Sequence, residues 1–282
     1  MNKNIQTFLA CDSSYDQAQA VLFGVPFDGT TSFRPGTRFG PSAIRSESFG
    51  LESYSPYCGQ DLTDYHVFDG GDLELPFGNT KRVLELIEAY TTKLLADNKR
   101  FLMLGGEHLI TLGALRAVLK RYPDVHIIHL DAHTDLRTEY LGEELSHSTV
   151  IRQIWNLVGD GRIHQFGIRS GEKYEFEFAQ AHTKLHKFNL EGFEKTVAQL
   201  KDKPVYVTLD LDVLDPSIFP GTGTPEAGGI TFKELLKAIL QLGQLHIIGC
   251  DVNELSPHYD QSGTSTAVAC KITREMILQI IK

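Results

Sequence analysis

The sequence is poor in cysteine and lacks long apolar segments, and both features exclude classes of protein. Its four cysteines are scattered, with no Cys-x-x-Cys pair: Cys11, Cys58, Cys250 and Cys270. This spacing indicates neither a zinc knuckle nor a disulfide framework. No apolar run approaches the ~20 residues of a membrane span, and the chain does not begin with a basic stretch followed by an apolar one. We therefore expect a cytoplasmic protein with no membrane partner.

Positive charge is also in deficit. The 282 residues include 27 Lys and Arg against 36 Asp and Glu, a net charge of −9. Such a balance argues against nucleic acid or an anionic membrane surface as a partner, because both attract basic proteins. It is compatible with a small cationic substrate.

The chain is long enough, and at 41% hydrophobic residues apolar enough, to bury a large core. We find no internal repeat or composition break, so a single domain over residues 1–282 is preferred. Apolar strand-like runs alternate with amphipathic helices, which is typical of a mainly parallel sheet covered on both faces. Strands are expected at 20–25, 66–72, 101–106, 125–130, 162–168, 183–188, 204–210 and 245–251. This pattern alone does not separate an open three-layer sheet from a closed (β/α)₈ barrel.

The most informative stretch is HLDAHTDLR, residues 129–137. Asp131, His133 and Asp135 occupy alternate positions directly after a probable buried strand, so their side chains leave the same face. Carboxylates placed this close repel each other and lose hydration unless a cation compensates. A metal ion would be such a cation.

Two further segments carry residues of the same kind. Asp210 and Asp212 follow the run PVYVTLD, and His108 follows a Gly-Gly turn in LGGEH. Each alone is more simply a solvated loop residue, a helix cap or a hydrogen-bonded histidine. All three segments follow strand-like runs, however, and functional groups of parallel α/β folds gather beyond the carboxyl ends of strands. Two histidines and four aspartates together suit a two-metal site.

With these motifs in place, the chain resembles the ureohydrolases, the arginase–agmatinase family of binuclear manganese enzymes. The resemblance rests on GVPFDGTTSFRPGTRFGP, GGEH, DAHTD, SHST, FGIRSG, DLDVLDP, GTGTPEAGG and DVNEL, in the family's order. It implies an arginase-like three-layer α/β/α sandwich with a mainly parallel sheet of about eight strands. It further implies a homo-oligomer, a trimer or hexamer, that hydrolyses a guanidinium compound to urea and an amine.

The resemblance also assigns ligands for two Mn²⁺ ions. By this reading, one ion is held by His108, Asp131, Asp135 and Asp210, and the other by Asp131, His133, Asp210 and Asp212. Independently, four carboxylates balance the charge of two divalent ions, and oxygen and imidazole ligands without thiolates favour Mn²⁺ over structural zinc. A single-zinc deacetylase of similar fold is disfavoured because six ligands suit two ions.

A mechanism follows as a hypothesis: a hydroxide bridging the metals attacks the guanidinium carbon while Asp135 accepts its hydrogen bond. His147, in SHST, is the expected proton donor or shuttle, although a loop histidine there could merely cap the next helix. Glu254, in DVNEL, matches the family's guanidinium-gripping residue; its alternative is an ordinary surface or helix-start glutamate. Thr224 is expected to line the pocket.

The substrate is less clearly indicated. Arg137 and the segment GIRSGEK depart from the arginase pattern and make arginine an unlikely substrate, whereas DGTTSFRPGTRFGP and FGIRSG are similar to agmatinases. Agmatine would yield urea and putrescine, which serves polyamine biosynthesis. If Arg137 and Arg169 faced inward they would suit guanidinobutyrate or guanidinopropionate; formiminoglutamate is a weaker alternative. A catalytically silent metal-binding scaffold is a further alternative, disfavoured because no expected site residue is missing.

Overall fold

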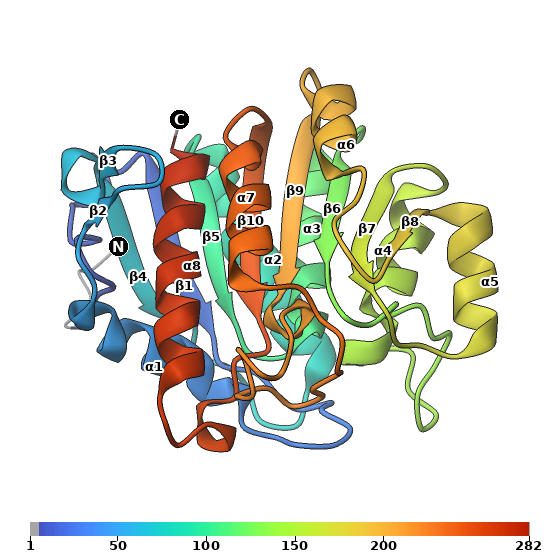
Figure 1. Ribbon diagram of the computed structural model, residues 1–282. Helices are drawn as coiled ribbons and strands as arrows, with labels where there is room; N and C mark the ends of the chain where they lie inside the picture. Colours follow the sequence, from blue (N-terminus) through green and yellow to red (C-terminus); the bar gives the residue numbers. More distant parts are fainter. Residues whose placement is uncertain (1–5, 282) are drawn as a thin grey trace.

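A computed structural model describes residues 6–281 and shows a parallel sheet between two layers of helices (Figure 1). The sheet has eight strands in the order β4-β1-β5-β10-β9-β6-β7-β8, with every neighbouring pair parallel. The strands are β1 (Ala20–Val25), β4 (Val67–Asp72), β5 (Arg100–Gly105), β6 (His126–Leu130), β7 (Ile163–Ile168), β8 (Lys184–Lys187), β9 (Pro204–Asp210) and β10 (His246–Asn253). Because β4 and β8 are opposite edges, the sheet is open. The expected three-layer sandwich is confirmed and the barrel alternative is wrong.

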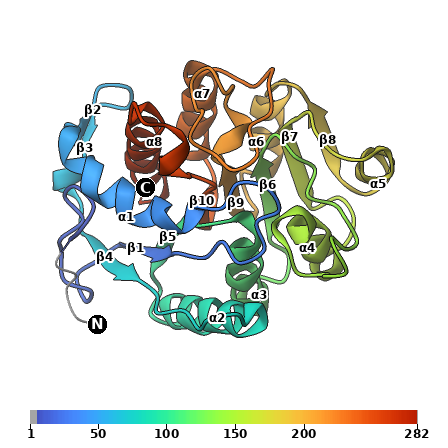
Figure 2. The same cartoon turned by 90° about the horizontal axis from the view of Figure 1, so that it is seen from below.

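Helices lie on both faces of this sheet (Figure 2). One face carries α1 (Gly40–Glu47), α6 (Phe193–Leu200), α7 (Phe232–Leu242) and α8 (Thr264–Ile280). The other face carries α2 (Thr80–Ala96), α3 (Thr111–Arg121) and α4 (Val150–Val158), with α5 (Lys173–His182) beside β8 at the sheet edge. Asn79 caps α2 by accepting a hydrogen bond from the Arg82 amide, and Pro41 lies in the first turn of α1, where its missing N–H costs no helical hydrogen bond.

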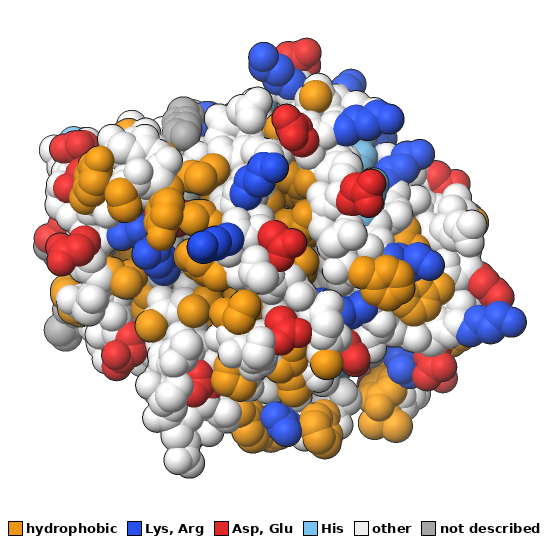
Figure 3. Space-filling view, viewed as in Figure 1, with side chains coloured by type: hydrophobic (Ala, Val, Ile, Leu, Met, Phe, Trp, Pro, Cys, Tyr) orange, Lys and Arg blue, Asp and Glu red, His pale blue; other side chains and the backbone are white. Residues whose placement is uncertain are grey.

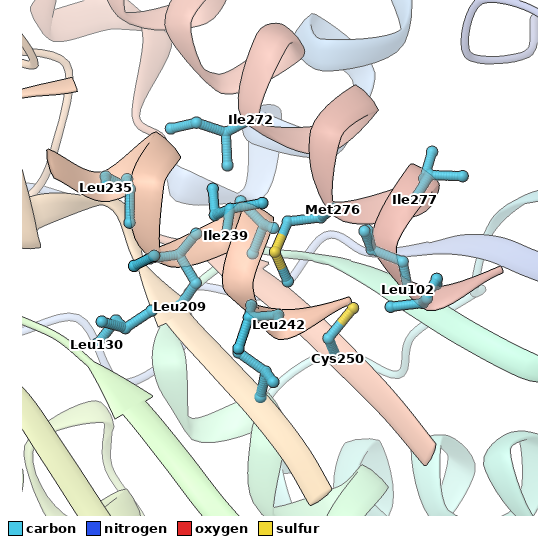
Figure 4. Close-up of a cluster of buried hydrophobic side chains, with 14 of the residues drawn as sticks. Leu102, Leu130, Leu209, Leu235, Ile239, Leu242, Cys250, Ile272, Met276 and Ile277 are labelled. Atoms are coloured by element: carbon cyan, nitrogen blue, oxygen red, sulfur yellow. The ribbon is translucent and has the colours of Figure 1, made fainter. Parts of the chain in front are cut away.

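Two apolar cores explain why the sheet strands read as continuous hydrophobic runs rather than alternating ones. Strand side chains pointing to one face pack under α7 and α8, where Leu209 and Cys250 meet Ile239 and Met276 (Figure 4). Those pointing to the other face pack under α2, α3 and α4. Cys250 is completely buried there and serves as a small apolar core residue.

One small element escapes sequence prediction. The antiparallel pair β2 (Tyr54–Ser55) and β3 (Gln60–Asp61) has only two residues in each strand, too few to show a period. Tertiary contacts hold it instead: Ser55 Oγ donates to buried Glu275 on α8, and Arg274 donates to the Tyr54 carbonyl.

On the surface, acidic and basic side chains are interspersed with apolar ones over the face that α7 and α8 form (Figure 3). Within residues 6–281, no helix combines the length and the apolar character needed to cross a membrane. The carboxyl ends of all eight strands meet at one edge of the sheet, the lower edge in Figure 1, where long loops gather.

Candidate metal centre and substrate cavity

Four adjacent strands at the middle of the sheet, β5, β10, β9 and β6, deliver the predicted site residues to this edge. They are His108 after β5, Asp131, His133 and Asp135 after β6, Asp210 and Asp212 at the end of β9, and Glu254 after β10. Segments separated by up to 146 residues thus meet because their strands are neighbours in a parallel sheet. All six predicted metal ligands lie together.

The turn before His108 depends on glycine. A Cβ at Gly106 would overlap the backbone of Phe27, and one at Gly105 would overlap the side chain of Asn253. The two glycines let the β1 and β10 loops approach the end of β5 closely. The Glu107 amide then donates to the Phe27 carbonyl at 2.7 Å, which fixes where His108 enters the site.

The β6 segment contributes one more residue than we predict from sequence. His129 precedes Asp131 by two positions, so it shares the face of Asp131, and its Nε2 lies 2.7 Å from Asp131 Oδ2. The same alternation that identifies Asp131 and His133 was the available signal for it. Asp135 closes the segment with φ of 52°, a left-handed conformation that is uncommon for non-glycine residues and recurs at functional sites.

Three carboxylates surround one ring nitrogen of His108. Nδ1 lies 3.0 Å from Asp131 Oδ2, 3.2 Å from Asp135 Oδ2 and 3.4 Å from Asp210 Oδ2. None of these oxygens stands in hydrogen-bonding geometry with Nδ1, and all four side chains are buried. Such a buried polar atom without a partner needs an explanation.

A second group lies on the other side of Asp131. His133 Nδ1 is 2.9 Å from Asp212 Oδ2 and 3.5 Å from Asp131 Oδ1. The Asp212 carboxylate is oriented by the Ala132 amide, which donates to it at 3.1 Å, and the Asp212 amide donates to Asp210 at 2.8 Å. Asp131 is thus shared by both groups.

The electrostatics of these carboxylates are strongly perturbed. Burial raises the pKa of Asp210 well above its usual range, and the charges of Asp212 and Asp131 raise it further. Burial and the charge of Asp131 raise the pKa of Asp135 to about 6. For Asp131, burial is outweighed by the adjacent imidazoles of His129, His108 and His133, so its pKa is well below normal. The cluster therefore carries uncompensated like charges in a buried place.

These observations fit divalent metal ions. Imidazole and carboxylate donor atoms converge, one ring nitrogen has no other partner, and concentrated negative charge needs a cation. The donors are oxygen and imidazole nitrogen without thiolate, a set that suits Mn²⁺ among other divalent ions. The residues present are thus a candidate metal centre.

Glu254 lies beside this cluster and is not a surface residue, because only 3% of it is exposed. Its Oε1 accepts the His108 amide hydrogen at 2.8 Å, and its φ of 68° is again left-handed. Burial raises its pKa well above normal, and the nearby carboxyl of Glu107 adds to the effect. A buried carboxyl of this kind, opening on a cavity, is suited to a cationic ligand.

His147 reaches the site from a loop on the opposite wall. Its amide donates to Thr30 Oγ1 at 3.0 Å, and its Nε2 lies 2.9 Å from Ser32 Oγ. Ser146, not His147, caps the following helical turn, so the capping alternative does not describe His147. Burial and the charges of His133 and His108 lower its pKa to about 4, which leaves the imidazole neutral at pH 7.

The loop after β1, whose Thr30 and Ser32 contact His147, is bound in turn by buried Glu107. Glu107 was not predicted as a site residue from the sequence. The carboxylate of Glu107 accepts the Thr30 amide hydrogen at 2.8 Å and hydroxyl hydrogens from Thr30 and Thr31. Its position beside His108 in GGEH was the only available sign. The long glycine- and proline-rich loop after β1 is thereby fixed against the site.

A cavity of about 330 Å³ opens onto these residues. Its wall includes Thr224, whose Oγ1 lies 3.5 Å from Asp212, together with His133, Asp135, His147, Asp210 and Glu254. Arg137 also lines it, but Arg137 lies 3.3 Å from Glu172 and 3.7 Å from Glu175 and stacks over Tyr140.

Arg169 does not face this cavity as a free cation. Its guanidinium donates to backbone carbonyls of Gly167, Asp212, Val213, Leu214 and Glu226. Its hydrogen bonds instead hold together the segments around residues 212–214 and 226, which follow β9. Asp215 is a turn residue that accepts hydrogen bonds from the amides of Ser217, Gly228 and Gly229.

Known proteins of similar sequence and structure place this geometry in context. Residues 18–279 match the Arginase family. An agmatinase of Bacillus anthracis is 48% identical over 98% of this chain and 97% of its own. An agmatine ureohydrolase of Thermoplasma volcanium superposes with a TM-score of 0.89 at 34% identity, covering 98% of this chain and 94% of that one. A proclavaminate amidino hydrolase of Streptomyces clavuligerus does so with a TM-score of 0.88 at 33% identity, covering 99% and 97%.

Proposed function

The chain belongs to the arginase family, and from that premise we propose that it hydrolyses agmatine to putrescine and urea with two Mn²⁺ ions at this centre. That it is a hydrolase acting on amidino compounds, as the sequence predicts, is confirmed by its relatives. The proposal concerns the substrate, the ions and the roles of individual residues.

The observation that carries the choice of agmatine is the charge of the cavity wall. Among the described residues, Arg137 is the single Lys or Arg that lines the cavity, against five Asp and Glu: Asp135, Asp210, Glu172, Glu175 and Glu254. Arg137 is engaged by Glu172 and Glu175, and Arg169 by backbone carbonyls. Neither guanidinium is free to receive a substrate carboxylate. The ions balance Asp135 and Asp210, and Arg137 offsets only one of Glu172 and Glu175. Together with Glu254, the remaining glutamate leaves the wall acidic, which favours a dication such as agmatine.

We assign His108, Asp131, Asp135 and Asp210 to one ion and Asp131, His133, Asp210 and Asp212 to the other. Bound there, a pair of divalent ions lowers the pKa of a water molecule towards neutrality, which supplies the nucleophile. The four carboxylates balance the charge of the two ions, and this relieves the repulsion that raises the pKa of Asp210 and Asp135.

The protein side chains then position the substrate and move protons. Glu254 receives the guanidinium through paired charge-assisted hydrogen bonds and directs its carbon toward the aspartates. Asp135 accepts a hydrogen bond from the attacking oxygen. Neutral His147, held over the cavity by Thr30 and Ser32, takes up the proton that this oxygen releases and delivers it to the leaving amine. Thr224 bounds the cavity beside Asp212.

Arg137 favours a second candidate. It lines the cavity, and a rotation away from Glu172, which is a largely exposed partner, would present it to a carboxylate such as that of guanidinobutyrate or guanidinopropionate. We also propose a single domain over residues 1–282, a cytoplasmic location and a homo-oligomer, in keeping with the family.

The test is a set of parallel urea-release assays on agmatine, arginine and guanidinobutyrate. Formiminoglutamate would release formamide instead of urea, so its hydrolysis is followed by measuring formamide directly. The protein is first stripped with a chelator and reloaded with Mn²⁺. We expect kcat/KM for agmatine to exceed the others by at least tenfold. A kcat/KM for guanidinobutyrate equal to or higher than that for agmatine would make guanidinobutyrate the substrate. Two bound ions with no turnover of any of these compounds would refute the proposed activity.

A further inference from the structure

Behind the candidate metal centre, on the side away from the cavity, His108 contacts a buried polar network that the proposed chemistry does not use. His108 Nε2 lies 2.7 Å from Thr208 Oγ1 on β9, and Thr208 Oγ1 donates to Asp251 Oδ1 on β10 at 2.6 Å. Thr208 and Asp251 are completely buried, and His108 is 1% exposed. A hydroxyl and a carboxylate thus stand in line behind the ring.

Asp251 is surrounded by hydrogen-bond donors. Tyr206 Oη donates to Oδ2 at 2.6 Å, Thr111 Oγ1 donates to Oδ2 at 3.0 Å, and the Asn253 side-chain amide donates to Oδ1 at 2.6 Å. With Thr208, four side chains from β9, β10 and α3 direct hydrogens to one carboxylate. A buried carboxylate held by four donors is rigid, and the directions of these hydrogen bonds are well defined.

These directions determine the tautomer of His108. A threonine hydroxyl has a single hydrogen, and that of Thr208 points to Asp251. Thr208 Oγ1 is therefore left as an acceptor toward His108, so the ring hydrogen lies on Nε2. In the neutral imidazole, Nδ1 then carries the lone pair, and this is the atom that three carboxylates surround at 3.0–3.4 Å. An imidazole binds a metal ion through such an unprotonated nitrogen.

We propose that Asp251 is a positioning residue, acting through Thr208, which holds His108 with Nδ1 unprotonated and aimed at the divalent ion and thereby sets the affinity of the His108 side of the centre. The inference rests on the proposed function in requiring a divalent ion there. Partners of this kind behind a ligating histidine typically contribute 10- to 100-fold in metal affinity.

The network also offers a matched control. Thr111 donates to the same carboxylate as Thr208, is equally buried, and has no hydrogen bond to His108. Valine has nearly the shape of threonine but lacks the hydroxyl. Thr208→Val therefore breaks the chain to His108. Thr111→Val removes one donor from Asp251 and the 3.3 Å contacts of the Thr111 hydroxyl with Thr208 and Asn253, but it leaves the Thr208 hydroxyl between Asp251 and His108.

The test measures Mn²⁺ binding to the full chain by calorimetry and by competition with a chelator, with no substrate present. We expect one of the two Mn²⁺ sites of Thr208→Val, the one that His108 serves, to lose about 10- to 100-fold in affinity. Thr208→Ser, which keeps the hydroxyl, should restore affinity to within about threefold of wild type, and Thr111→Val should stay within the same range. Wild-type affinity in Thr208→Val, or an equal loss in Thr111→Val, would overturn the inference.

A second measurement tests the part played by Asp251 and guards against misfolding. Asp251→Ala should weaken Mn²⁺ binding in the wild-type background and add little in the Thr208→Val background, because both changes break the same chain. Losses of Mn²⁺ affinity that add fully in the double variant would contradict the proposal that Asp251 acts through Thr208. Circular dichroism and Tm in chelator establish that each variant is folded. If the wild-type protein does not hydrolyse agmatine but Thr208→Val still weakens Mn²⁺ binding, the proposed substrate is wrong and the inference about His108 stands.

Discussion

Replacing Glu254 with glutamine tests how this site grips a guanidinium group. The two carboxylate oxygens have different surroundings. Oε1 accepts the His108 amide hydrogen at 2.8 Å, whereas Oε2 lies on the side of Gly223, next to Thr224 of the cavity wall. In Glu254→Gln the amide oxygen must take the place of Oε1, because only an oxygen can accept that hydrogen. The new NH₂ group then occupies the place of Oε2.

This orientation places a donor where the guanidinium also presents donors. The substrate loses one acceptor and the negative charge that strengthened the remaining bond. Hydrogen bonds to charged groups contribute about 1.5–3 kcal/mol each, so the expected loss is about 2–4 kcal/mol. That corresponds to a decrease of roughly 30- to 900-fold in kcat/KM.

Stability should respond differently from activity. Glu254 is 3% exposed and its pKa is raised well above normal, chiefly by burial, so its charge is costly in the folded chain. Glutamine keeps the bond to His108 without that charge, and Tm should therefore be equal to wild type or higher.

The assay is steady-state urea release from agmatine at saturating Mn²⁺, alongside Mn²⁺ content and Tm. Glu139→Gln provides the control, since it makes the same charge change on an exposed residue that does not line the cavity. The reasoning fails if Glu254→Gln keeps kcat/KM within threefold of wild type while remaining folded and loaded with Mn²⁺. A lower Tm together with lost metal would instead show that Glu254 supports His108 rather than the substrate.

Three further predictions concern the proton shuttle, the metal and acid stability. His147→Ala should lower kcat by ~10²–10⁴-fold with Mn²⁺ content unchanged, and loss of metal in this variant would show a structural role. After chelation, Mn²⁺ should restore urea release better than Zn²⁺, because the donors are mainly carboxylate oxygens; the reverse ranking would overturn the metal assignment. Burial and the neighbouring His126 lower the pKa of His164 to about 4. Between about pH 6.5 and pH 4, His164 is therefore protonated in the unfolded chain but neutral in the folded chain. Stability should fall as the pH drops through this range, by about 2 kcal/mol at pH 5 from His164 alone. The free energy of unfolding, measured with denaturant, should drop between pH 7.5 and pH 5.0 by about 2 kcal/mol less in His164→Gln than in wild type. An equal drop in both proteins would refute this role of His164.

Much of the fold follows from local pattern. Each of the eight strands of the parallel sheet was predicted within two residues, because strands covered by helices on both faces appear as uninterrupted apolar runs. The hairpin of β2 and β3 was not, since its pairing depends on contacts with Ser55 and Arg274 rather than on a period. Strand order was also beyond local pattern. The open sheet was chosen over a barrel through family resemblance, and the edge positions of β4 and β8 confirm that choice.

The sequence by itself determined the chemistry that the site can hold. Alternation after β6 placed Asp131, His133 and Asp135 on one face, and the positions of His108, Asp210 and Asp212 after other strand-like runs added the rest. Tertiary structure decided which atoms meet and which groups remain free. It placed β5, β10, β9 and β6 side by side, turned Arg169 onto backbone carbonyls, and set Thr208 and Asp251 behind His108. Hydrogen-bond direction and burial arise only when distant strands pack together, so no pattern within one segment can encode them.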